Sequence, residues 1–72
     1  MNLLICVKNK GYEASLEVRK LYQSLTDERA ASLGMVRVVD ESGEDYLYSE
    51  DLFQPIRIEK RLEKELFAPA AA

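Results

Sequence analysis

The chain has 72 residues, a formal charge of −3, one cysteine and no histidine. This length fits one small domain, which we expect over residues 1–67 with a frayed tail over residues 68–72, and such a domain buries only about 60% of its unfolded surface. Without histidine and with a single cysteine, the chain lacks the residues for serine–histidine or cysteine–histidine catalysis and the nitrogen and sulfur ligands of a zinc site, so we expect no cofactor.

Residues 2–7, NLLICV, are short and apolar and predict a buried first strand that ends at the turn-like residues 8–11, KNKG. We interpret Cys6 in this strand as a small buried hydrophobe and not as a reactive thiol, because no histidine is present to activate it. The apolar run Leu3–Val7 is shorter than the region of about 7 to 15 residues in a secretory signal. No segment approaches the roughly 20 apolar residues that cross a bilayer, so we expect a cytoplasmic protein without a membrane role.

Residues 12–25 allow two interpretations. Their apolar side chains are spaced as one face of an amphipathic helix, which would give an α+β fold with a helix at about 13–25; these side chains are Ala14, Val18, Leu21, Tyr22 and Leu25. The alternative is an irregular segment over residues 12–17 followed by a strand over about 19–25 that contributes to a barrel wall. Periodicity alone favours the helix.

A short helical turn is predicted over residues 28–33. Thr26 and Asp27 can cap its start with side-chain oxygens, Glu28 favours the positive end of its dipole, and Gly34 is well placed to end it.

Residues 35–48, MVRVVDESGEDYLY, predict a β-hairpin with its turn at Ser42 and Gly43. In a two-residue loop, Asp40 faces Asp45 and Arg37 faces Tyr48. The two faces of the hairpin are then Arg37, Val39, Tyr46 and Tyr48 on one side and Val36, Val38 and Leu47 on the other. A three-residue loop would shift this register by one and change the faces.

A strongly acidic segment, residues 40–51, begins in the hairpin. It carries a formal charge of −6, while the rest of the chain carries +3. Its six acids are Asp40, Glu41, Glu44, Asp45, Glu50 and Asp51. A cluster of one sign attracts cationic partners. The plainer interpretation is a solvated hairpin tip that keeps the protein soluble.

The last segments are predicted as a tight turn over residues 49–53, a strand over residues 54–58 and an amphipathic helix from Glu59 onward. Phe53 is expected in the core, and Pro55 suggests an edge strand or a strand start. Ile58, Leu62 and Leu66 are four residues apart, so they form an apolar stripe. A helix this short needs a surface for its stripe, either the open end of the barrel or a second subunit, and a homodimer is one possible outcome.

The segments KNKGYEASLEVRKLYQSL and RVVDESGEDYLY, followed by Phe53 and Ile56, resemble a family of short bacterial proteins that are mostly uncharacterised. The match runs from about Leu3 to Leu66, and DESGEDYLY at residues 40–48 is its most specific part. The resemblance implies a mainly β fold, a small Src-homology-3-like barrel, and it favours the strand over about 19–25. This chain has Thr26 and Ser49 where the family is associated with proline.

The residue types favour a binding protein over an enzyme. Arg37, Tyr46 and Tyr48 suggest a recognition face, since arginine and tyrosine are enriched at binding hot spots; alternatively, the tyrosines cover the barrel and Arg37 neutralises a neighbouring acid. We therefore predict a non-enzymatic protein-interaction module that binds a protein partner, or itself, through an acidic, tyrosine-bearing hairpin. The candidate binding residues are Arg37, Asp40, Glu41, Glu44, Asp45, Tyr46 and Tyr48.

The alternative function is a cation- or nucleic-acid-binding accessory protein. Paired acids across the turn would make a weak divalent site, although the glycine is fourth in DESGED and a calcium loop needs it sixth. A basic patch of Lys8, Lys10, Arg19 and Lys20 is the route to RNA, but only Tyr12 and Tyr22 are near it for stacking, so nucleic acid is an unlikely partner.

Overall fold

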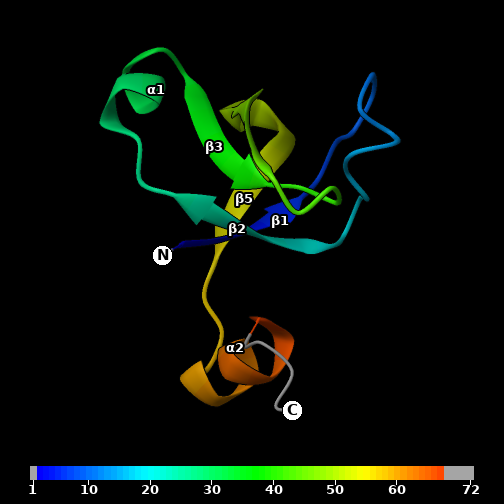
Figure 1. The fold of residues 1–72 in the computed structure, drawn as a ribbon, viewed down its shortest axis with the longest axis vertical. Helices are drawn as coiled ribbons and strands as arrows, with labels where there is room; N and C mark the ends of the chain where they lie inside the picture. Colours follow the sequence, from blue (N-terminus) through cyan, green and yellow to red (C-terminus); the bar gives the residue numbers. More distant parts are fainter. Residues whose placement is uncertain (1, 68–72) are drawn as a thin grey trace.

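The computed structural model describes residues 2–67, which form five antiparallel strands in one open sheet with short helical elements between and after them (Figure 1). In chain order these are β1 (Asn2–Cys6), β2 (Leu21–Leu25), α1 (Glu28–Ser32), β3 (Met35–Val39), β4 (Asp45–Ser49), the 3₁₀ turn η1 (Glu50–Leu52), β5 (Phe53–Ile56) and α2 (Lys60–Phe67). The mainly β prediction is confirmed. Neither helix in residues 2–67 has the length and apolar character needed to cross a membrane.

The strand order in the sheet is β4-β3-β2-β1-β5, so β4 and β5 are consecutive in the chain but lie at opposite edges. Neighbouring strands are about 4.8 Å apart, so a flat sheet would separate these edges by about 19 Å. The three residues of η1 advance only about 2 Å each. The sheet is therefore curled, and its two edges approach each other at η1.

The core lies inside this curl. Its buried residues come from β1, the segment before β2, β2, β3, β4 and β5; they are Leu4, Cys6, Leu16, Tyr22, Val38, Tyr48 and Phe53. Phe53 contacts Tyr22 and Tyr48 edge to face, with ring centroids 6.3 and 6.1 Å apart, a favourable arrangement for aromatic pairs. The predictions of a buried Cys6 and of Phe53 in the core are confirmed, and burial raises the pKa of the Cys6 thiol.

The predicted helix at about 13–25 is wrong, and the strand interpretation is confirmed by β2. Residues 7–20 form a long loop whose ends are joined by backbone bonds between Cys6 and residues 19 and 20. Arg19 has a φ of 72°, which no right-handed helix accepts. Leu16 is buried while Val18 is 39% exposed, so packing of the loop against the core overrides the helical spacing.

The hairpin register is also shifted by one from the two-residue prediction. Arg37 faces Leu47, and Val36 faces Tyr48. The loop has three residues, 41–43, because Asp40 N–H donates to the carbonyl of Glu44, and Gly43 has a φ of 83°. The expected face of Arg37, Tyr46 and Tyr48 is wrong, since a shift of one residue turns Arg37 to the opposite side from both tyrosines.

The predictions for the two helices are close. Asp27 caps α1 by accepting a 2.9 Å hydrogen bond from Ala30 N–H, and Gly34, with a φ of 71°, follows the end of this helix. In Figure 1, α2 lies at one end of the longest axis, joined to β5 by an extended segment. No α2 side chain is buried, and Leu62 and Leu66 are 44% and 51% exposed. The expected tail over residues 68–72 lies outside the described residues.

We predict that Leu16→Ala lowers the free energy of unfolding by about 2–5 kcal/mol, because it opens a cavity among Leu4, Tyr22 and the other core side chains. Val18→Ala, at an exposed site that the helical pattern assigned to the core, is the matched control and should cost less than about 1 kcal/mol. Urea unfolding of both variants measures this. Equal losses would contradict the loop packing described above.

Candidate functional site

The hairpin residues predicted as a binding site divide into buried and exposed groups. Asp40 and Tyr48 are buried, with 7% and 4% of their surfaces exposed. The Tyr48 hydroxyl donates to Asp40 Oδ2 at 2.6 Å, and Asp40 Oδ1 accepts from Ser42 N–H at 2.9 Å and from Ser42 Oγ at 2.6 Å. The Asp40 carboxylate therefore fixes the turn and anchors β4 to the core, and a partner cannot reach it without opening the hairpin.

This network sets the protonation of both groups. Burial of Asp40 opposes its ionisation, but the hydrogen bonds from Ser42 and Tyr48 outweigh burial and hold the pKa of this carboxyl below its ordinary value. Burial and the bond to Asp40 together raise the pKa of Tyr48 to about 12. At neutral pH the pair is therefore a carboxylate and a neutral phenol, which is the combination that the hydrogen bond requires.

Two more of the predicted acids are neutralised by bases of this chain. Arg37 Nε donates to Asp27 at 3.0 Å and its Nη1 donates to Asp45 at 2.9 Å, so one guanidinium joins the cap of α1 to the start of β4. Lys20 forms an ion pair with Glu41 at the hairpin tip. The interpretation of Arg37 as a neutralising group thus fits its contacts.

The exposed remainder of the hairpin is small. Tyr46 is 48% exposed, and its hydroxyl donates to Glu44 Oε2 at 2.8 Å. Leu47, on the opposite face of β4, is 44% exposed. Of the predicted site, only Glu44 and Tyr46 form an exposed pair without a basic partner among the described residues.

The cation and nucleic-acid alternatives depend on clusters of acids or of bases. Within residues 2–67, no group of three or more acidic, cysteine or histidine side chains is placed to hold a metal ion. Lys20, one of the four bases considered for RNA, is paired with Glu41.

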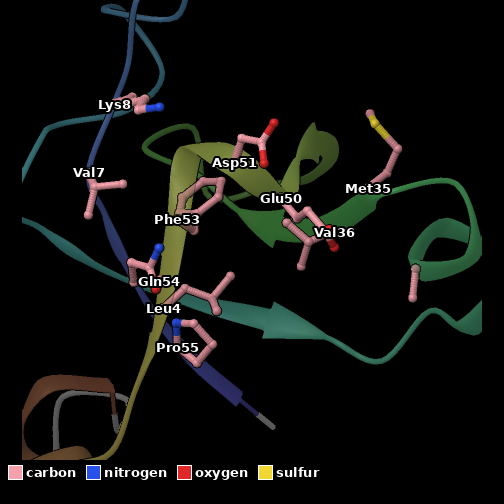
Figure 2. A pocket seen from close by; sticks show the side chains of 11 residues that line it. Leu4, Val7, Lys8, Met35, Val36, Glu50, Asp51, Phe53, Gln54 and Pro55 are labelled. Atoms are coloured by element: carbon pink, nitrogen blue, oxygen red, sulfur yellow. The ribbon is translucent and has the colours of Figure 1, made fainter.

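A groove of about 600 Å³ lies beside η1, with β3 on one side and β5 on the other (Figure 2). In Figure 2, Met35 and Val36 of β3 lie on one side, and Leu4, Phe53 and Pro55 of β1 and β5 lie on the other. Its volume is typical of sites that bind ligands or peptide side chains. β3 and β5 line the groove without pairing with each other, because β2 and β1 lie between them in the sheet.

The rim of this groove is acidic. Glu50 and Asp51 of η1 line it and have no ion pair among the described residues, whereas Lys8 is the single base in the lining. A second hollow, of about 210 Å³, lies beside α1, and Ala31, Met35 and Val36 line both this hollow and the groove. The combined surface is an apolar floor with carboxylates at its edge, which suits an apolar segment that also carries lysine or arginine.

Parts of this groove carry a signal in the sequence. Glu50 and Asp51 belong to the acidic segment, Phe53 is predicted in the core, and Pro55 suggests an edge strand or a strand start. No pattern in the chain connects them with Leu4 and Val36, which lie far away in sequence and join the groove only through the order of strands.

The comparisons with family models, with curated proteins and with solved structures each give no match for this chain. The resemblance of residues 3–66 to short bacterial proteins therefore stays a prediction, and the function has to be inferred from the geometry of these surfaces.

We predict that Asp40→Asn lowers the free energy of unfolding at neutral pH by about 1–3 kcal/mol, because an amide cannot accept all three bonds from Ser42 and Tyr48. The folded pKa of Asp40 is depressed, so its contribution is present above the ordinary pKa of about 4 and is lost as the pH falls through the folded value. Unfolding measured from neutral to acidic pH should show the two proteins converging. Asp51→Asn, an exposed matched change that leaves the bonds of Asp40 intact, should cost less stability at neutral pH than Asp40→Asn.

At alkaline pH we predict the reverse dependence for Tyr48. Its folded pKa of about 12 lies above the ordinary value, so its contribution is complete below about pH 10 and is lost as the pH rises towards 12. Tyr48→Phe should therefore lose less stability over this range than the unchanged chain. Parallel unfolding curves for the two proteins would show that Tyr48 ionises as easily in the fold as outside it.

Proposed function

We propose that this chain is a non-enzymatic protein-interaction module that binds an apolar, basic segment of a protein in the groove beside η1. The observation that carries the proposal is the combination of apolar lining residues, among them the exposed Pro55 and the partly buried Val36, with a rim whose acids Glu50 and Asp51 have no ion pair in residues 2–67. An apolar anchor in the groove supplies affinity, and the carboxylates select a cationic flank.

We also propose that the curled sheet is a small barrel of the Src-homology-3 type. Support comes from the short η1 connection between strands at opposite edges and from the long loop over residues 7–20, whose Leu16 closes one side of the core. The carbonyl of Leu52 accepts bonds from the N–H groups of Val7 and Lys8, which ties η1 to the end of β1. In such a barrel the groove would lie beside η1, between β3 and β5.

The exposed pair of Glu44 and Tyr46 is the second candidate surface for the same function. Tyrosine at a half-exposed position on an edge strand is a common binding residue. This pair is a weaker candidate for a binding surface than the groove, because its neighbours Glu41 and Asp45 are already paired with Lys20 and Arg37. Less net negative charge is left at the hairpin tip than its sequence implies.

We expect peptides selected on this protein from a random displayed library to combine apolar residues with lysine or arginine. Backbone amide resonances mapped by NMR should shift on peptide addition at Leu4, Val36, Phe53 and Gln54. Glu50→Lys should weaken binding by about tenfold or more, because it reverses the charge at the groove rim.

The matched control is Glu44→Lys, which makes the same change of charge at the hairpin. If Glu44→Lys weakens binding more than Glu50→Lys and the shifts centre on Tyr46, the hairpin is the binding surface and the groove is not. If no peptide is selected, the groove proposal fails.

A further inference from the structure

The helix α2 exposes an apolar stripe that its own chain covers only in part. Leu62 and Leu66 are about half exposed, and Ile58 just before the helix is half buried. An isolated helix of eight residues is too short to be stable in water, so its stripe needs a surface to pack on. Among the described residues, its last turn borders such a surface: Leu66 and Phe67 line a hollow together with Leu21, Tyr22 and Val39.

The groove beside η1 is the complementary surface on the same molecule. Its floor is apolar, and none of its lining residues comes from α2. Arg61 flanks the stripe of α2 next to Leu62, and Lys60 and Lys64 give the helix three bases against two acids. The existing partner of Arg61 is Glu65, at 3.9 Å with both side chains mostly exposed, and such a pair is weak enough to exchange for Glu50 or Asp51.

The connection between the two surfaces determines how copies would assemble. Pro55 lines the groove and only Arg57–Glu59 separate β5 from α2, so a short extended segment leads from each groove to the helix of the same copy. In a two-fold pair, each helix can therefore reach the groove of the other copy. In this exchange the contact between helix and groove forms twice, and the assembly ends at two copies. If each helix instead bound the groove of a further copy, the contacts would extend into an open chain of copies.

We propose that the protein forms a homodimer in which α2 of each copy packs into the η1 groove of the other. This rests on the proposed function, since it names the occupant of the same groove: a second copy of this chain, recognised through Leu62 and Leu66 on the apolar floor and through Arg61 at the acidic rim.

Light scattering on the full chain over a concentration series tests the proposal. We expect a dimer for the unchanged protein. Leu62→Glu with Leu66→Glu, and separately Glu50→Lys with Asp51→Lys, should each raise the dissociation constant by about tenfold or more. Glu44→Lys is the control for added positive charge and should leave the dimer unchanged. All substituted side chains are exposed, and urea unfolding checks that each variant is folded.

Mixing the two double variants gives the sharper result. One retains a functional groove and the other a functional helix, so the mixture should form a heterodimer through one contact at concentrations where each double variant alone is mostly monomeric. If helices pair with each other, the groove variant remains a dimer and the mixture gains nothing, which overturns the proposal. A monomer at every concentration also overturns it, while peptide binding to the groove would still support the interaction module.

Discussion

The fold depends on the short connection between β4 and β5. β4 and β5 occupy opposite edges of the sheet, yet only Glu50–Leu52 join them, so the sheet has to curl until the edges meet at that point. Hydrogen bonds from Val7 and Lys8 to Leu52, and from Glu50 to Gly34, hold the connection to both sides of the curl. The inside of the curl becomes the core, and the space beside η1 between β3 and β5 becomes the groove.

Several acids of residues 40–51 stabilise the fold through contacts within the chain, so they are less available to a binding partner. Asp40 is buried and satisfied by Ser42 and Tyr48, and this network fixes the hairpin loop. Asp45 is tied through Arg37 to the cap of α1, and Glu41 is tied through Lys20 to the start of β2. The carboxylates left without ion pairs in residues 2–67 include Glu50 and Asp51, so the remaining attraction for cations lies at the groove and not at the hairpin tip alone.

A small domain buries little apolar surface. Two of the apolar areas that residues 2–67 leave exposed are the groove, with Val7, and the stripe of α2, with Leu62 and Leu66. Their charges are of opposite character, with acids on the rim and an excess of bases on the helix. The two areas are also close in sequence, because η1, which lines the groove, precedes β5 and α2 follows it. A chain with two complementary exposed surfaces has the physical basis for recognising a partner segment and for recognising itself.

The sequence by itself determined the elements whose signals are local. The first strand, the capped turn after Asp27, the hairpin and the amphipathic terminal helix follow from alternation, capping and turn residues that act within a few positions. Tertiary structure decided the rest. Residues 21–25 became a strand against their helical spacing because β1 and β3 pair with them on both sides. The hairpin loop took three residues, which separated Arg37 from the tyrosines and buried Tyr48 in the core. The groove joins Leu4, Val36 and Phe53, which no local pattern connects, because strand order and the curl of the sheet are properties of pairing between distant segments.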